Sequence, residues 1–227
     1  MCGRFSLTTD EQQLNLFFEL SGGNAPYVPR YNGAPTQELS VITGEGPRRL
    51  QLFRWGLIPG WCLEVPKVPI INARRETLEH KPSFRNIFRE KRCLVPADGF
   101  YEWVHSGRKL PYRFTLNDGS LFAFAGIWDT WKQADGKEVN SFAIITTDAN
   151  KEVQPVHDRM PVILEKASFD TWLHNTDVNK LKPLLEPIPA PRIKKYRVPE
   201  LVNKATAEGP ELIVACEPME FFDGELF

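Results

Sequence analysis

The sequence lacks the features that would place it in a membrane or around a metal ion. No apolar run among its 227 residues reaches the roughly 20 needed to cross a bilayer, and no secretory signal follows the polar amino terminus. The four cysteines lie far apart, form no CxxC pair and have no histidine at metal-ligand spacing. We therefore expect reduced thiols, no cofactor or metal, and a cytoplasmic protein, associated with the nucleoid if the source is bacterial.

Neither positive nor negative charge dominates the chain. Its 28 basic and 29 acidic residues give a net charge of −1, with a pI near 6.5. This balance excludes a surface covered in positive charge but leaves room for a local basic groove. Basic residues gather between positions 74 and 92, whereas the last eleven residues, EPMEFFDGELF, are acidic. Such runs usually form a solvated face, so alone they identify no partner.

Repeats, low-complexity linkers and a regular strand–helix alternation are also absent, which favours one domain. Apolar periodicity predicts helices over 8–20, 83–91, 167–175 and 178–185. Short apolar segments between prolines and glycines predict strands over 39–43, 50–58, 93–97, 100–104, 112–116, 121–131, 141–147, 160–164 and 211–216. We expect a single α+β domain whose sheet is mostly antiparallel and barrel-like, with helices at its periphery.

The chain opens with MCGRF, and Cys2 becomes the first residue if Met1 is removed. It then carries a free α-amine and a thiol on adjacent carbons. Their ordinary pKa values, about 8 and about 8.5, leave both groups partly in the reactive form at neutral pH. The segment alone does not separate this 1,2-aminothiol from an accident of sequence.

Three polar residues interrupt apolar segments. Asn72 follows an apolar stretch in IINARRETL, Glu102 lies between two aromatic residues in FYEWV, and His157 precedes a strand in VHDRMPVIL. A carboxyl among aromatic rings has a raised pKa and suits general acid chemistry, and a histidine transfers protons near pH 7. Each also has a structural interpretation: a loop amide, an outward-facing surface glutamate and a turn cap. Spacing does not show that the three meet.

Eight segments in order resemble one protein family. They are MCGRF, RYNGAP, RWGLIPGW, INARRETL, RCLVPADGFYEW, FAGIWD, FAIITTDAN and VHDRMPVIL. Together they resemble the SRAP (SOS response-associated peptidase) family of abasic-site processing proteins. The match is strongest over residues 2–165, with weaker similarity at Val202–Asn203 and over 211–216. The resemblance implies a single SRAP domain over 2–227.

The resemblance implies an activity and a site. Members of the family crosslink covalently to abasic sites in single-stranded DNA through the amino-terminal cysteine, forming a thiazolidine that protects the lesion during the DNA damage response. It implies Cys2, Asn72, Glu102 and His157 as catalytic residues. Glu102 would exchange protons during sugar ring opening and Schiff-base dehydration, His157 would serve the sugar hydroxyl and reversal, and Asn72 would orient the amine or the deoxyribose. Self-processing of Met1 is a peptidase-like activity also attributed to the family, although methionine aminopeptidase accepts a following cysteine as well.

The same resemblance selects residues for DNA binding. Arg4, Arg74, Arg85 and Arg159 lie in or beside the family motifs and are the phosphate candidates. Trp61, in PGW, is a candidate wedge or stacking platform for a splayed base. The expected partner is single-stranded DNA that contains an abasic site, bound by a monomer.

Two other classes of function remain open from the residues themselves. Amino-terminal-nucleophile glutamine amidotransferases also begin with a cysteine and use its α-amine as a base, although no synthase domain follows here. A non-catalytic reader of single strands would keep the arginines and Trp61 but would need no acid beside Cys2.

Overall fold

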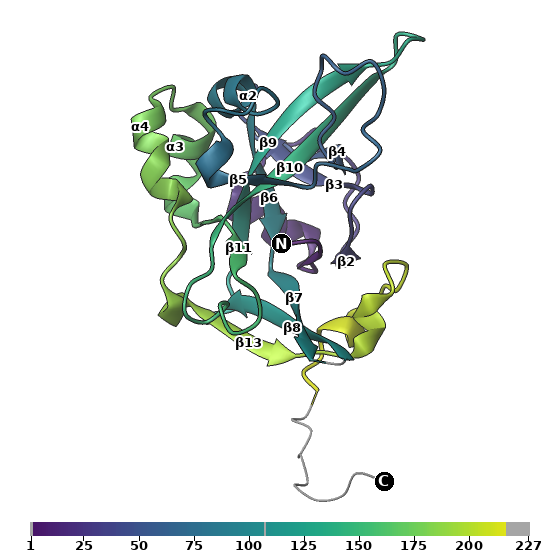
Figure 1. Ribbon diagram of the computed structural model, residues 1–227, viewed down its shortest axis with the longest axis vertical. Helices are drawn as coiled ribbons and strands as arrows, with labels where there is room; N and C mark the ends of the chain where they lie inside the picture. Colours follow the sequence, from purple (N-terminus) through teal and green to yellow (C-terminus); the bar gives the residue numbers. More distant parts are fainter. Residues whose placement is uncertain (1, 107, 217–227) are drawn as a thin grey trace, which may run out of the picture.

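Two β-sheets form the centre of the computed structural model, which describes residues 2–106 and 108–216 (Figure 1). The first sheet is antiparallel and has the order β13-β8-β7-β1-β2, with the bounds Ile193–Arg197, Arg108–Leu116, Gly99–Ser106, Phe5–Leu7 and Arg30–Gly33. The second has the order β11-β10-β4-β3-β6-β9-β12, with β5 also beside β10. In that order its bounds are Arg159–Pro161, Glu138–Asp148, Gln51–Trp55, Glu38–Thr43, Arg92–Ala97, Phe122–Lys132 and Ile163–Leu164, and β5 is Asn72–Arg74.

The second sheet closes on itself. β10 pairs with β4 at one end of the order and with β9 near the other, so β10, β4, β3, β6 and β9 form a closed five-stranded barrel. Only the β10–β4 contact in this ring is parallel. Close approach inside the barrel needs a glycine, because a Cβ on Gly126 would lie 2.6 Å from the Cys93 sulfur. The predicted α+β domain with a mostly antiparallel, barrel-like sheet is confirmed.

Helices are few, and three of them gather on one side of the barrel (Figure 1). The α-helices α1 to α4 span Glu11–Phe18, Arg85–Glu90, Phe169–His174 and Val178–Leu181. The 3-10 turns η1 to η6 span Arg75–Thr77, Lys166–Ser168, Lys182–Leu185, Ala190–Arg192, Glu200–Asn203 and Pro210–Ile213. All four predicted helices therefore exist, and each is shorter than predicted. No helix within the described ranges is long and apolar enough to cross a membrane.

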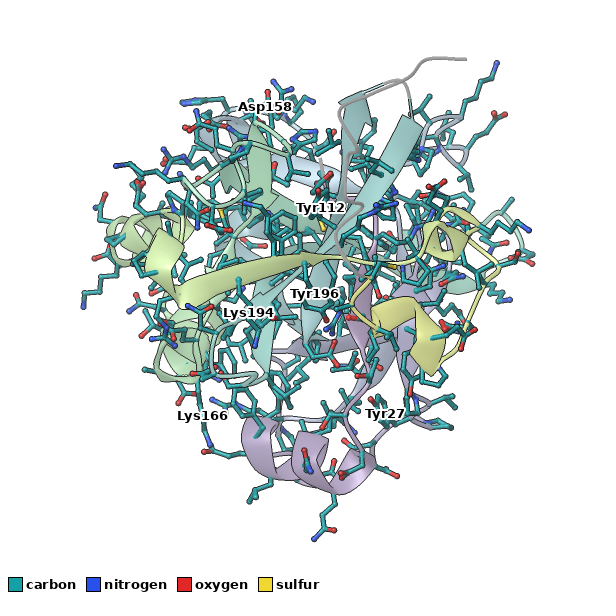
Figure 2. All side chains as sticks on the ribbon, turned by 90° about the horizontal axis from the view of Figure 1, so that it is seen from below. Tyr27, Tyr112, Asp158, Lys166, Lys194 and Tyr196 are labelled. Carbon is teal, nitrogen blue, oxygen red and sulfur yellow. The ribbon has the colours of Figure 1, made fainter. Side chains whose placement is uncertain are left out.

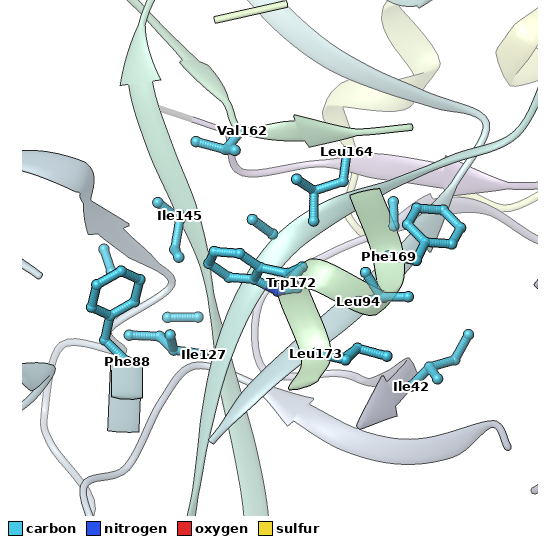
Figure 3. Close-up of a cluster of buried hydrophobic side chains, with 14 of the residues drawn as sticks. Ile42, Phe88, Leu94, Ile127, Ile145, Val162, Leu164, Phe169, Trp172 and Leu173 are labelled. Carbon is cyan, nitrogen blue, oxygen red and sulfur yellow. The ribbon is translucent and has the colours of Figure 1, made fainter. Parts of the chain in front are cut away.

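The barrel packs on α3 through a core centred on Trp172 (Figure 3). This side chain is fully buried, and its indole N–H donates to the Cys93 carbonyl at 3.0 Å. Arg92, at the start of β6, is also buried and donates to the Phe88 and Asn175 carbonyls at 2.8 and 2.7 Å. It thus satisfies carbonyls at the ends of α2 and α3, which otherwise lack intrahelical donors.

One predicted strand is wrong. Residues 211–216 contain no strand: the 3-10 turn η6 begins at Pro210, whose ring fixes the backbone at the first position of a turn. Leu212 alone is fully buried there, in a cluster with Tyr101, Trp103 and Val202. One inward residue per turn is the pattern of a helix packed on a sheet. The final residues 217–227, noted above as acidic, lie outside the described residues.

Candidate functional site

Cys2 lies immediately before β1, where the amino-terminal segment runs between β2 and β7. Its side chain is fully buried, and its sulfur is 3.9 Å from the Arg4 carbonyl. It belongs to a hydrophobic cluster against which Ile71, Tyr112 and Val156 pack. Ile71 and Val156 directly precede Asn72 and His157, so the segments carrying both residues reach the cluster of Cys2. Burial raises the pKa of the thiol, and the negative charge of Glu102 raises it further.

Glu102 lies in β7 opposite Tyr112 of β8. Its side chain is only 3% exposed, and its neighbours Tyr101 and Trp103 are also buried. The interpretation of Glu102 as an outward-facing surface residue is therefore wrong. Burial raises the pKa of Glu102 from 4.5 to about 7, and Asp158, the residue immediately before β11, also acts to raise it. At neutral pH the carboxyl thus exists in both forms, as a general acid–base group requires.

Asn72 opens β5 and pairs with Ile144 of the barrel strand β10. Its amide nitrogen donates to the Ile71 carbonyl at 3.0 Å. Its Oδ1 is buried and accepts no hydrogen bond from residues 2–106 or 108–216. A buried acceptor without a hydrogen bond costs about 1–3 kcal/mol of stability. This unpaired oxygen therefore favours a ligand that donates a hydrogen bond to it.

His157 occupies the turn that leads into β11. Its Nδ1 accepts a hydrogen bond from the Arg159 backbone N–H at 2.9 Å. The same Nδ1 lies 2.9 Å from the Asp158 carboxylate. A hydrogen bond between these two atoms requires a proton on Nδ1. In the neutral ring the backbone contact places the proton on Nε2, which is then a donor.

The five DNA-binding candidates fall into two groups. Trp61 is 67% exposed, and Arg74 and Arg85 are exposed, at the end of β5 and the start of α2. Arg4 is half-buried and donates to Asn32 Oδ1 and the Val202 carbonyl, both at 2.8 Å. Arg159 is buried, and its guanidinium pairs with Glu76 and Asp148 (below). The structure thus leaves Trp61, Arg74 and Arg85 open to a ligand, while Arg4 and Arg159 have partners within the protein.

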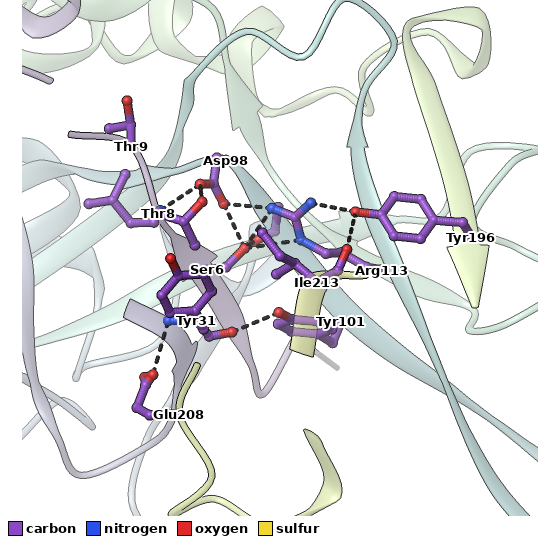
Figure 4. Close-up of polar contacts among 12 residues, drawn as sticks. Ser6, Thr8, Thr9, Tyr31, Asp98, Tyr101, Arg113, Tyr196, Glu208 and Ile213 are labelled. Atoms are coloured by element: carbon purple, nitrogen blue, oxygen red, sulfur yellow. Dashed lines mark hydrogen bonds and ion pairs between the residues drawn. The ribbon is translucent and has the colours of Figure 1, made fainter. Parts of the chain in front are cut away.

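A polar network that sequence reasoning missed is centred on Arg113 (Figure 4). Arg113 of β8 donates to Asp98 Oδ1 at 2.8 Å, to Ser6 Oγ at 3.0 Å and to the Tyr196 hydroxyl at 2.6 Å. It therefore links β1, β7 and β8 to β13, whose Lys194 and Tyr196 are labelled in Figure 2. The only sequence signal was the dipeptide Asp98–Gly99 inside a family motif.

Gly99 is part of this arrangement, because a Cβ there would lie 2.7 Å from Arg113 Nε. The carboxy-terminal segment also contributes. The Trp103 indole N–H donates to Asn203 Oδ1 at 2.6 Å, next to the Val202 carbonyl that receives Arg4. The weak family similarity at Val202–Asn203 thus marks contacts beneath β7.

A cavity of about 580 Å³ is lined by residues that include Thr8, Phe17, Asp98 and Lys166, and by none of the four catalytic candidates. Figure 2 shows Lys166 and Asp158 at opposite sides of the molecule. No group of three or more His, Cys, Asp or Glu side chains suited to a metal ion occurs in the part of the chain that the structure describes.

The fold and the site define a small α+β barrel protein in which a buried cysteine near the amino terminus lies within electrostatic reach of a buried glutamic acid in β7. The chain belongs to the SOS response associated peptidase (SRAP) family, whose profile matches residues 1–205. The predicted domain boundaries, 2–227, extend beyond this match and stay a prediction.

Named relatives cover nearly the whole chain. The abasic site processing protein YoqW of Bacillus subtilis is 43% identical over 94% of this chain and 99% of its own length. YedK of Escherichia coli, also named an abasic site processing protein, is 31% identical over 94% and 99%. A crystal structure of a Bacteroides thetaiotaomicron protein superposes with a TM-score of 0.85 at 27% identity, covering 95% of this chain and 100% of that one.

Proposed function

We propose that this protein recognises abasic sites in single-stranded DNA and forms a covalent thiazolidine with them through Cys2, once Met1 has been removed. The names of the relatives support a role at abasic sites. The observation that carries the chemistry is the buried Cys2 thiol, whose pKa responds to a Glu102 carboxyl with a pKa of about 7. A non-catalytic reader of single strands would need neither group.

The reaction uses both nucleophiles of one residue. The α-amine of Cys2 attacks the C1′ aldehyde of the open deoxyribose and gives a carbinolamine. Loss of the carbinolamine hydroxyl as water leaves a Schiff base, and the thiol then adds across the C=N bond while the nitrogen gains a proton. The five-membered ring contains nitrogen, Cα, Cβ and sulfur of Cys2 and the sugar carbon. An internal cysteine lacks the free amine and cannot close it.

The neighbouring side chains supply the proton transfers. Glu102 in its protonated form gives a proton to the departing hydroxyl, and its carboxylate takes one from the thiol, whose raised pKa makes a base necessary. The unpartnered Asn72 Oδ1 accepts a hydrogen bond from the amine or a sugar hydroxyl. His157 donates from Nε2 to the sugar hydroxyl and serves reversal of the adduct.

The DNA strand is proposed to follow the exposed end of β5. Arg74 lies two residues after Asn72, and Arg85 and Trp61 complete the exposed candidates. Arginines contact phosphates without reading sequence, and an exposed indole stacks on any base. Arg4 and Arg159 are proposed to hold the site together, since protein acceptors bind one terminal nitrogen of Arg4 and both terminal nitrogens of Arg159. The protein is proposed to act as a monomer.

Replacing Arg74 with alanine is expected to weaken binding to every single-stranded sequence to a similar degree. The slope of log K against log salt should fall by about 0.7, the contribution of one neutralised phosphate. Fluorescence anisotropy over a salt series measures both. Arg49, exposed on the β3–β4 turn, provides the control substitution Arg49→Ala, which should change neither quantity. An equal loss of DNA affinity in both variants would show that Arg74 makes no specific contact with the DNA.

The experiment that tests the function mixes the purified protein with a single-stranded oligonucleotide carrying one abasic site. Denaturing electrophoresis should then show a covalent adduct that is absent with an intact duplex. Reversible binding without an adduct would favour the non-catalytic reader, and glutaminase activity would favour the amidotransferase. Intact mass before the reaction shows whether Met1 is absent. Retention of Met1 in Glu102→Gln alone would assign its removal to the site itself.

A further inference from the structure

The Arg159 guanidinium is held by a fork of acceptors next to the proposed site. Its two terminal nitrogens contact both carboxylate oxygens of Glu76, at 2.9 and 3.1 Å. One of them also donates to Asp148 Oδ1 at 2.7 Å, and the other to the Thr146 carbonyl at 2.8 Å. A two-point contact between arginine and a carboxylate fixes orientation as well as distance.

This cluster crosses the barrel strand β10 near its end. β5 and β11 both pair with β10 at Thr146, which lies opposite Arg74 on one edge and Pro161 on the other. Glu76 follows β5 in η1, whereas Arg159 opens β11. The ion pair therefore ties the segment after Asn72 to the segment after His157.

The backbone of the same arginine contacts the histidine. The Arg159 N–H donates to His157 Nδ1 at 2.9 Å, and Asp158 competes for that nitrogen at the same distance. The backbone contact requires Nδ1 without a proton, whereas the Asp158 contact requires a proton on it. The two contacts are thus mutually exclusive, and the backbone contact depends on where Arg159 lies.

We propose that Glu76 and Asp148 are positioning residues: they clamp Arg159 so that its backbone N–H holds His157 with the proton on Nε2. The side chains of Glu76 and Asp148 are 46% and 66% exposed, but Arg159 is buried, so removing both carboxylates is expected to lower stability, and thermal melting of each variant must accompany the test. Arg75, 3.6 Å from Asp148 and 2.7 Å from Glu186, joins the same surface cluster without touching the histidine turn. The kinetic consequence of the clamp rests on the proposed function, whereas its effect on the ring does not.

The direct test observes the imidazole of the free protein. Long-range proton–nitrogen NMR spectra at pH above the titration of His157, assigned with His157→Ala, should show Nε2–H in the wild type. The double variant Glu76→Ala/Asp148→Ala should show a rise in the Nδ1–H form. Glu79→Ala, which breaks the nearby pair with Lys182 at 3.0 Å, should leave the ring unchanged. An unaltered His157 tautomer in the double variant would overturn the proposal.

A kinetic test follows the adduct. The double variant is expected to form it about tenfold more slowly at unchanged affinity for single-stranded DNA, because small misplacements of a reacting group cost large factors in rate. In a His157→Ala background the same pair of substitutions should cause no further loss. A full further loss there would show that the clamp acts through another group and overturn its assignment. If the wild type forms no adduct at all, the proposed function fails, and the NMR measurement still decides the positioning role.

Discussion

Cys2→Ala is expected to abolish the covalent DNA adduct while the protein stays folded and still binds single-stranded DNA reversibly. Alanine retains the α-amine, so a Schiff base can form, but without sulfur the ring cannot close and the imine hydrolyses on denaturation. The change removes one buried atom from a well-packed cluster and creates only a small cavity. Denaturing electrophoresis with an abasic oligonucleotide measures the adduct, and thermal melting measures the fold.

Cys93 provides a matched control for this result. It is also fully buried, lies in the same cluster, and has a pKa raised by burial. Cys93→Ala should therefore cost similar stability while the adduct forms as in the wild type. Cys2→Ser should give at most a labile imine. A stable adduct in Cys2→Ala would eliminate the aminothiol mechanism.

Glu102→Gln is expected to slow adduct formation by about 10²–10⁴-fold, the usual contribution of a positioned acid–base group. Glutamine keeps the shape of the side chain but has no proton to exchange, so affinity for single-stranded DNA should be unchanged. The rate of the wild type should vary with pH around the Glu102 pKa of about 7, and the variant should lose that dependence. The measurement is a time course of adduct formation between about pH 5 and pH 9.

The same substitution has a predicted effect on stability with a definite sign. The folded-state pKa lies above the unfolded value, so the folded protein binds more protons between pH 4.5 and about 7. The free energy of unfolding of the wild type therefore falls as pH rises through that window, by roughly 3 kcal/mol in total. Glutamine has no charge to bury. The variant should thus be more stable than the wild type at about pH 8 and similar below about pH 4.5.

Denaturant unfolding at both pH values checks this sign. Each preparation needs an intact mass, because a variant that retains Met1 would lack the amine for a different reason; a cleavable leader that exposes Cys2 removes the difficulty. An unchanged rate together with unchanged stability at high pH would return Glu102 to a purely structural role.

The sequence predicted the helices and the long strands because their apolar patterns repeat over several residues. Four strands were not predicted: β1, β2 and β5 span three, four and three residues, and β13, IKKYR, is mostly basic. Tertiary pairing decides such segments, since their own propensity is weak. The run 211–216 was mistaken for a strand because a short apolar segment does not distinguish a strand from a helical turn.

For the site, the sequence identified candidate residues by their chemical type but did not show which residues they contact. The aromatic residues on both sides of Glu102 left open whether its side chain is buried or faces solvent, and the structure shows that it is buried. That Arg159 faces Glu76 rather than solvent follows from the two strands that flank β10, and no spacing in the sequence reveals that contact. The catalytic assignment of Cys2, Asn72, Glu102 and His157 stays a prediction until the adduct is measured.

Closure of the barrel through β10 also determines when the site forms during folding. β10 must pair with β4 and β5, which lie far earlier in the chain, and contacts between distant segments form late and slowly. β5, which carries Asn72, pairs with no other strand among the described residues. Asn72 therefore reaches the neighbourhood of Cys2 only after β5 has paired with β10, whereas Glu102 reaches it through the also long-range pairing of β7 with β1. In the proposed mechanism, a partly folded chain would therefore carry the Cys2 nucleophiles without all of their proton-transfer partners, and adduct formation would require the completed fold.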